Sequence, residues 1–307
     1  MATELARSDE VHLKTFVGPR SLIGRMIYPM LEQRRTLAGV MSWIGLGLLV
    51  AFILIAILAP VLAPYDPLRF VGNPNEAPSG DHWMGTDNLG RDLFSRVLHG
   101  ARTSLIIMTI GVLLALAIGF PVGLYSGYTG GRVDRVLVLV MDSVYAFPGL
   151  LLAALVAVIL GKGVLNIGIA ITVIYVPLYY RVTRNQTIAI KQETYVEAAR
   201  ALGARPRIVM WSYIAYNVLV SIPVIFSLSA ADAILTAAGL SFLGLGLERP
   251  VPDWGIDLSD AQQFLDNGVW WTSFFPGFMI ILLTVGLSFL GEGLNDLVNP
   301  LLKKERT

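Results

Sequence analysis

Long apolar runs separated by shorter polar stretches dominate the chain between residues 43 and 290. The first run, Trp43 to Ala63, has no charged residue over 21 positions. At 1.5 Å per residue, a helix of that length crosses roughly 30 Å of hydrocarbon. Five later runs are also long enough: Ser104 to Tyr125, Val136 to Leu160, Val164 to Tyr180, Ile214 to Leu240 and Phe274 to Leu290. The pattern therefore predicts six membrane-spanning helices, with both termini on one side.

The composition supports a membrane protein. Hydrophobic residues make up 55% of the 307 residues and charged residues only 15%, which is outside the range of soluble domains. A net charge of +1 argues against nucleic-acid binding, which needs a clustered excess of Lys and Arg. Cysteine is absent and the three histidines lie far apart, so no metal site is expected. We expect an all-α integral membrane protein surrounded by lipid.

Basic residues indicate the orientation of the chain in the membrane. Of the 23 Lys and Arg, 17 fall on the side of the termini and six on the other. Short loops rich in Lys and Arg stay in the cytoplasm, so both termini are predicted to be cytoplasmic. The predicted division is a cytoplasmic tail (1–42), a first transmembrane helix (43–63), an extracytoplasmic segment (64–103), a core of five transmembrane helices (104–298) and a second cytoplasmic tail (299–307). The core includes an inner loop at 190–213 and an outer segment at 241–273.

Small residues recur every four positions in the second span, at Gly111, Ala115, Gly119, Gly123 and Gly127. They lie on one face of a helix, where they let another helix approach closely. We expect this stripe to serve helix packing rather than ligand binding.

Two carboxylates fall inside predicted spans, Asp142 in the third and Asp232 in the fifth. A carboxylate in hydrocarbon is costly unless it faces a wet cavity or a partner. Each residue is therefore either part of a polar pathway or bonded to a neighbouring helix, and both roles stay open. In the outer segment before the second span, Asp87, Arg91 and Asp92 are expected to pair and to cap the helix that follows.

A polar island, residues 191–217, separates the fourth and fifth spans. Residues 194–202 are strong helix formers, Gly203 suits the left-handed end of a helix, and Pro206 suits the start of another. The island thus predicts a helix-turn-helix elbow on the cytoplasmic side. A bare connection needs only a few residues, so an elbow of this length indicates a docking surface.

The island resembles the EAA loop of the membrane subunits of bacterial and archaeal ABC importers, through Glu197-Ala198-Ala199, Gly203 and Ile214. More closely, the chain resembles the second (C-type) permease of the dipeptide and oligopeptide (peptide/nickel) family. The match runs from about Asp66 to Leu302 and includes, in order, GTDNLGRDLFSRVLHGARTSL, AFPGLLLA, YVEAARALGA, LSFLGLG, PDWG and WW followed by FPG.

The resemblance implies a type I ABC importer permease with a cytoplasmic coupling-helix elbow, in the cytoplasmic membrane. Its partners would be a second permease in a heterodimer, two ATP-binding subunits and an extracytoplasmic substrate-binding protein. The complex would pass dipeptides or oligopeptides across the membrane by alternating access. This chain lacks a GxxxxGK[ST] loop, so it would not be an enzyme and would hold no cofactor, with ATP and Mg bound by the partner subunits.

The resemblance also implies roles for individual residues. Glu197 would pair with a basic residue in a cleft of one ATPase, the alanines would pack against that cleft, and Gly203 would make the turn. The full set implied for ATPase coupling is Tyr195, Glu197, Ala198, Ala199, Arg200, Gly203 and Arg205. Candidate contacts to the binding protein are Glu248, Arg249, Asp253 and Trp254 in the outer segment.

The chain departs from the family pattern at two places. The family usually has Ile-Leu-Pro-Asn where this chain has Ile214-Ala215-Tyr216-Asn217, so a helix-breaking proline is missing and the elbow is expected to join the fifth span more smoothly. Ala237 stands where the family commonly has a glutamate, so the role of that glutamate does not carry over.

Other functions remain as alternatives. Relatives with this pattern also handle oligosaccharides or nickel chelates. A secondary carrier driven by an ion gradient could use Asp142 and Asp232, but it would not need the elbow. An intramembrane enzyme is disfavoured, because the sequence has no HExxH, no GxSxG and no cysteine nucleophile.

Overall fold

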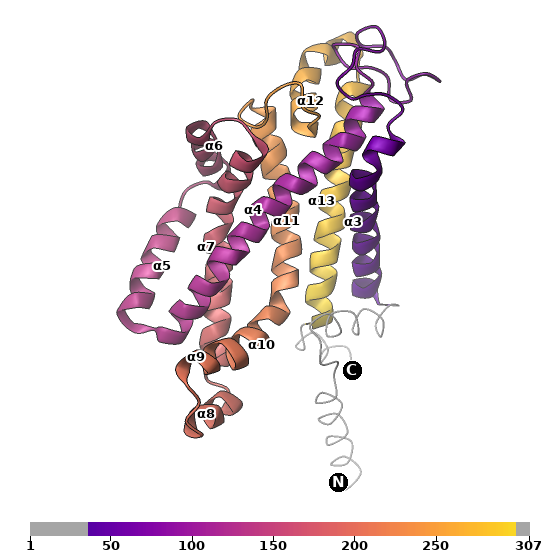
Figure 1. The fold of residues 1–307 in the computed structure, drawn as a ribbon. Helices are drawn as coiled ribbons and strands as arrows, with labels where there is room; N and C mark the ends of the chain where they lie inside the picture. Colours follow the sequence, from indigo (N-terminus) through magenta and orange to yellow (C-terminus); the bar gives the residue numbers. More distant parts are fainter. Residues whose placement is uncertain (1–35, 299–307) are drawn as a thin grey trace.

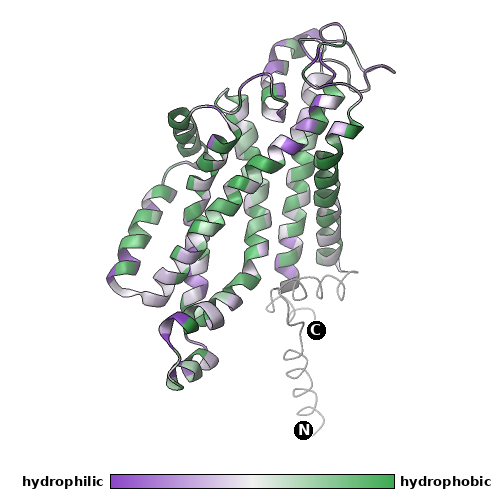
Figure 2. Ribbon diagram, in the orientation of Figure 1, coloured by the Kyte–Doolittle hydropathy of each residue, from purple (hydrophilic) through white to green (hydrophobic). Residues whose placement is uncertain are grey.

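The computed structural model describes residues 36–298, and five long helices run side by side through this part of the chain (Figure 1). They are α3 (Leu37–Leu62), α4 (Leu93–Thr129), α7 (Val164–Ile190), α11 (Ile222–Phe242) and α13 (Trp271–Val298). Each is long and apolar enough to cross a membrane. Hydropathy is highest along the middle of these helices, and polar residues gather at both ends (Figure 2). The predicted tails, residues 299–307 and most of 1–42, lie outside the described residues.

The third predicted span is not one straight helix, which corrects the prediction of a continuous run from Val136 to Leu160. It forms α5 (Gly131–Tyr145) and α6 (Gly149–Leu160), bent by 88° at residues 146–148. Pro148 causes the break, because proline has no N–H to donate and disfavours helical geometry at the residue before it. Counted together, the bent pair brings the candidate spans to six.

The helix of the second span begins at Leu93, before the apolar run that starts at Ser104 and directly after the residues expected to cap it. Asp92 caps it, since one carboxylate oxygen accepts hydrogen bonds from the backbone N–H and the hydroxyl of Ser95, at 2.8 Å and 2.7 Å. Helix α4 therefore extends well beyond the hydrocarbon and reaches into the outer segment.

The predicted stripe of small residues packs α4 against α7, as expected. A methyl carbon placed on Gly119 would lie 2.7 Å from the carbonyl oxygen of Val176, and one on Gly123 would lie 2.5 Å from that of Tyr180. Real side chains do not approach this closely, so only glycine lets the two backbones touch. Helices α4 and α7 consequently form one rigid pair along most of their length.

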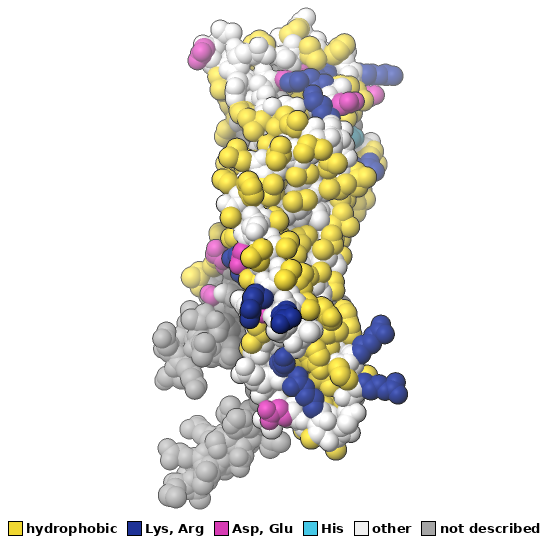
Figure 3. Space-filling model, turned by 90° about the vertical axis from the view of Figure 1, so that its left-hand side faces the viewer, with side chains coloured by type: hydrophobic (Ala, Val, Ile, Leu, Met, Phe, Trp, Pro, Cys, Tyr) yellow, Lys and Arg dark blue, Asp and Glu magenta, His cyan; other side chains and the backbone are white. Residues whose placement is uncertain are grey.

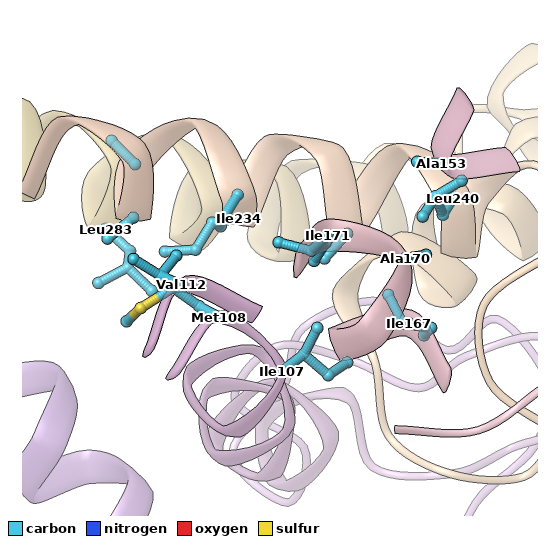
Figure 4. Packing of buried hydrophobic residues seen from close by; sticks show 14 of the residues in the cluster. Ile107, Met108, Val112, Ala153, Ile167, Ala170, Ile171, Ile234, Leu240 and Leu283 are labelled. Carbon is cyan, nitrogen blue, oxygen red and sulfur yellow. The ribbon is translucent and has the colours of Figure 1, made fainter. Parts of the chain in front are cut away.

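The main hydrophobic core lies where this pair meets α11 and α13 (Figure 4). Met108 and Val112 of α4, Ile171 of α7, Ile234 of α11 and Leu283 of α13 are all buried in it. In the space-filling view, a broad hydrophobic band separates charged side chains at the two ends of the molecule (Figure 3). This arrangement matches a membrane-embedded middle and two aqueous ends.

Each end carries a distinct polar structure. At one end, the segment 64–92 folds over α12 (Trp254–Ala261) and the 3₁₀ helix η3 (Gln262–Asn267) (Figure 1). At the other end lies the elbow, which starts with α8 (Thr194–Ala201). It continues through α9 (Pro206–Ile208), the π-helix η1 (Val209–Ala215), α10 (Tyr216–Val218) and the 3₁₀ helix η2 (Leu219–Ser221) into α11.

Candidate functional site

Helix α8 ends in a tight left-handed turn that fixes the shape of the elbow. Gly203 has φ +81°, and its backbone N–H donates to the carbonyl of Arg200 at 2.9 Å. The N–H of Ala204 donates to the carbonyl of Ala199 at 3.0 Å. These two bonds define a Schellman motif, in which glycine is favoured because a side chain is strained at positive φ. Pro206 then starts the next helix, as the sequence predicted.

One face of α8 anchors the elbow to the membrane helices. Val196 is fully buried, in a cluster with Phe120 and Leu124 of α4 and Val209 and Ile214 of the following helical segment. Ala199, predicted to meet a partner, is buried on the same side at 7% exposure. Because this face is packed, Ala199 sets the spacing of the elbow and offers little surface of its own.

The opposite face of α8 is exposed. It presents Glu197 and Ala198, and the side chain of Leu202 is 88% exposed at the tip. Gly203 and Arg205 are exposed as well. A leucine that protrudes from a short, well-ordered helix next to a free carboxylate forms a small apolar surface with a charged edge, which suits a protein partner.

A polar hollow of about 320 Å³ lies beside this face, lined by Glu197, Arg200, Lys191 and Asp134 among others. The ammonium of Lys191 donates to the backbone carbonyl of Tyr128 at 2.5 Å. The guanidinium of Arg200 lies 5.5 Å from the centre of the Tyr128 ring, a cation–π contact. Arg200 therefore braces α8 against the end of α4.

The elbow joins α11 without a break, in agreement with the missing proline. Helical hydrogen bonding continues from Pro206 to Phe242, although residues 209–215 form a π-helix and 219–221 a 3₁₀ helix. The side-chain amide of Asn217 donates to the hydroxyl of Tyr195 at 3.0 Å, which ties this segment back to α8. This bond and the packing of Val196 attach α8 to the helical segment that continues into α11.

Helix α5 is held to α7 by two ion pairs. Arg184 binds both carboxylate oxygens of Asp134, at 2.5 Å and 2.6 Å, and Ser126 of α4 donates to the same carboxylate. Further along, Arg181 donates to Asp142 at 2.8 Å, and both of these side chains are about half exposed. Asp142 therefore has a partner on a neighbouring helix, which is the second of the two roles considered for it.

Asp232 differs from Asp142 because no cation pairs with it in the described part of the chain. It is exposed on α11 and accepts a hydrogen bond of 2.6 Å from the hydroxyl of Tyr175 on α7. A carboxylate facing lipid at the centre of a helix costs about 2.5–3.5 kcal/mol. The side of α11 that carries Asp232 is therefore one that lipid does not cover.

A buried charge network locks the opposite end of the molecule. Arg96 of α4 is fully buried and donates from Nε and Nη2 to one oxygen of Asp257 in α12, at 3.0 Å and 2.5 Å. Its Nη1 reaches the carbonyls of Pro67 and Pro250 at 3.2 Å and 3.3 Å. Arg96 thus joins three segments that are distant in the sequence. Removing one partner of a buried pair costs about 3–5 kcal/mol, so this network holds the outer segment in place.

The predicted pairing near the start of α4 is confirmed. Arg91 donates from Nε to Asp87 at 2.6 Å, and Asp92 is the N-cap described above. These residues at the start of α4 have a structural role.

Burial raises the pKa of the Asp257 carboxyl, and the neighbouring Arg96 lowers it.

Two of the four candidate contacts to a binding protein are buried, which corrects the prediction for Asp253 and Trp254. Their exposed fractions are 3% and 1%. Asp253 caps α12 by accepting from the N–H of Ile256 at 3.0 Å, and the indole N–H of Trp254 donates to the carbonyl of Val97 at 3.0 Å. Both residues face inward, since Trp254 attaches α12 to α4 and Asp253 caps α12.

The other two candidates, Glu248 and Arg249, are exposed, and Arg249 pairs with Asp260. They remain available to a partner on the outer surface.

Removal of the Asp253 side chain from water raises the pKa of its carboxyl to about 6. Nearby Asp257 raises the pKa of Asp253 further, and the bond from Ile256 lowers it.

Comparison with known proteins matches residues 119–304 to the family described as "Binding-protein-dependent transport system inner membrane component". The chain belongs to this family. Residues 34–78 match a second family, "N-terminal TM domain of oligopeptide transport permease C". The first match covers the elbow and the helices on either side of it, and the second covers α3 and the start of the outer segment.

Similar proteins of the family are permeases of nearly the same length. A dipeptide transport system permease protein of Alkalihalophilus pseudofirmus is 40% identical over 263 residues, which cover 85% of this chain and 86% of the relative. A glutathione transport system permease protein of Pectobacterium atrosepticum is 39% identical over 263 residues, covering 85% and 87% of the two chains. The resemblance to dipeptide and oligopeptide permeases is thereby confirmed. The chain is a multi-pass membrane permease of an ABC importer that works with ATP-binding and substrate-binding proteins.

Sequence reasoning missed two interactions that organise this permease. Arg96 lies within the GTDNLGRDLFSR stretch, but its partner Asp257 is 161 positions away and no sequence pattern connects them. The pair of Asp134 and Arg184 was missed for the same reason. A signal existed for Arg184, which stands just after an apolar run, where an unpaired charge would be costly.

Proposed function

We propose that this permease passes dipeptides or similar short peptides into the cell by alternating access, driven through its elbow by separate ATP-binding subunits. The observation that carries the proposal is the exposed face of α8, with Glu197, Ala198 and Leu202, on an elbow whose second part continues from Pro206 into α11. This face is shaped for an ATPase cleft, with Glu197 paired to a basic residue there and Arg205 at its edge.

The proposed complex contains this chain, a second permease as its heterodimer partner, two ATPases and an extracytoplasmic binding protein. Closure of the ATPases on ATP would draw the elbows together, and the helices would open outward to accept substrate from the binding protein. Hydrolysis would reset them. ATP and Mg belong to the ATPases, and both termini and the elbow lie in the cytoplasm.

Peptides are proposed as the substrate because similar permeases are named for dipeptide and glutathione transport. Oligosaccharides and nickel chelates are the alternatives. Mass spectrometry of the ligand that co-purifies with the cognate binding protein separates these classes. A peptide mass supports the proposal, and a sugar or a nickel chelate refutes the peptide assignment.

The coupling role is tested with Glu197→Arg in the assembled importer. We expect ATPase activity stimulated by the loaded binding protein to fall to the basal level, because the reversed charge repels the basic residue in the ATPase cleft. Glu292→Arg is the control, since Glu292 is an exposed glutamate on α13, away from the elbow. Full ATP-driven uptake by Glu197→Arg, with ion gradients collapsed, would contradict the coupling role.

A further inference from the structure

Asp232 stands at the middle of α11, ten residues from each end of the helix. At 1.5 Å per residue, this puts the carboxylate about 15 Å from either end, near the midplane of the bilayer. It shares one helix face with Leu228 and Leu235, both large side chains that are exposed, at 40% and 48%. Asp232 is thus the charged position on an open stripe of α11.

The carboxylate is positioned from behind by α7. The hydroxyl of Tyr175 donates to one carboxylate oxygen at 2.6 Å, and Tyr175 itself is only 5% exposed. The hydrogen bond from Tyr175 fixes the orientation of the carboxylate. The other oxygen accepts no hydrogen bond from the described part of the chain, so it faces outward from the stripe and is open to a ligand.

Lipid cannot cover this charge, and no cation of the described chain pairs with it. The second intramembrane acid, Asp142, shows the contrast, because Arg181 satisfies it. Carboxylates at the bilayer midplane that lack such a partner face a water-filled route or its cargo. The open stripe of α11 therefore borders the route through which substrate passes.

We propose that Asp232, held by Tyr175, binds the α-ammonium group of a peptide as it crosses the membrane. The inference rests on the proposed peptide function. Dipeptides and glutathione both carry an α-ammonium group, which offers three donors to a carboxylate. A neutral oligosaccharide has no such group. Asp232 recognises the cation, and Tyr175 is a positioning residue.

The test uses the complete importer in proteoliposomes, with a dipeptide and its N-acetylated form as probes. Both are first shown by calorimetry to bind the binding protein, and each is supplied at saturation, so that any discrimination arises in the membrane. Asp232→Asn should slow uptake of the free-amine peptide about tenfold, the effect of losing one charge-assisted hydrogen bond, and leave the N-acetylated peptide unchanged. Tyr175→Phe should give a smaller loss with the same selectivity.

Two further variants sharpen the result. Asp232→Glu keeps the charge and should retain the preference for the free amine. Asp266→Asn, an exposed acid on the outer surface, should change neither rate. Equal loss for both peptides, or failure of the Asp232→Asn complex to assemble, would overturn the inference, because a structural ion pair with another subunit would behave in that way. Unchanged uptake of both peptides would also overturn it. Absence of ATP-driven peptide uptake by the wild-type complex would instead refute the proposed function.

Discussion

Asp253 gives the permease a stability that depends on pH. The carboxyl is 97% removed from water, and burial raises its pKa from 3.8 to about 6. In the unfolded chain the same group has its ordinary, lower pKa. Between pH 4 and pH 6 the folded protein therefore binds more protons than the unfolded one, so stability decreases as pH rises through this range. The difference between about 6 and 3.8, at 1.36 kcal/mol per pKa unit, corresponds to about 3 kcal/mol at neutral pH.

Asp253→Asn removes this penalty and keeps a residue that can cap α12, because asparagine is as good an N-cap as aspartate. The unfolding midpoint of the variant minus that of the wild type should be smallest near pH 4 and should increase until about pH 6.5. Thermal unfolding in detergent, followed by tryptophan fluorescence, measures this difference, and the buried Trp254 lies next to the substituted residue.

Asp257 also titrates in the same α12, but it is present in both proteins and largely cancels in the difference. Asp266→Asn is the control, since this exposed carboxyl should give a difference that does not depend on pH. A difference for Asp253→Asn that stays flat, or that favours the wild type at neutral pH, would refute the reasoning. It would mean that the hydrogen bond from the Ile256 N–H to the Asp253 carboxylate stabilises the fold by more than the lost hydration of that carboxylate destabilises it.

Two other predictions follow from packing and orientation. Gly119→Leu should lower the unfolding free energy by about 1–3 kcal/mol through overpacking, because the Cβ of Tyr179 would lie 2.7 Å from the new side chain. Gly47 has open space around it, so Gly47→Leu is the control and should leave the unfolding free energy unchanged in the same denaturation series. Equal effects would contradict the close approach of α4 and α7. Because the chain has no cysteine, Leu202→Cys and Trp83→Cys, both at exposed positions, report orientation directly. A membrane-impermeant maleimide should label the first only in inverted vesicles and the second only in right-side-out ones, and the reverse result would overturn the assigned topology.

The sequence was sufficient to predict the helical fold and the elbow, because these depend on local chemistry. Apolar length identifies the spans, and Gly203 and Pro206 mark the end and the restart of a helix wherever they occur in such a pattern. The break at Pro148 was within reach of the same reasoning, yet the apolar run on both sides of it favoured a single span.

Long-range pairing could not be predicted. The partner of Arg96 is chosen by how α12 packs against α4, and periodicity does not carry that information. The buried positions of Asp253 and Trp254 depend on the same packing, so a stretch that looks like a polar outer loop turned out to face inward. The sequence alone could not separate the roles of Asp142 and Asp232, because helix packing decides which residue of α7 lies opposite each acid. Arg181 lies opposite Asp142, and Tyr175 lies opposite Asp232.

The close contact of α4 with α7 has a mechanical consequence. Helix α4 has 37 residues and is therefore about 55 Å long, from the base of the elbow to the buried Arg96 network. Since the glycines let the backbones of α4 and α7 pack against each other, we expect the pair to turn as one lever. A tilt of about 5° at the elbow end would displace the far end by about 5 Å, on the scale of one helical turn. Because the Arg96 network ties the outer segment to that tip, we expect a small push on the elbow to move the outer segment at the opposite end of the molecule.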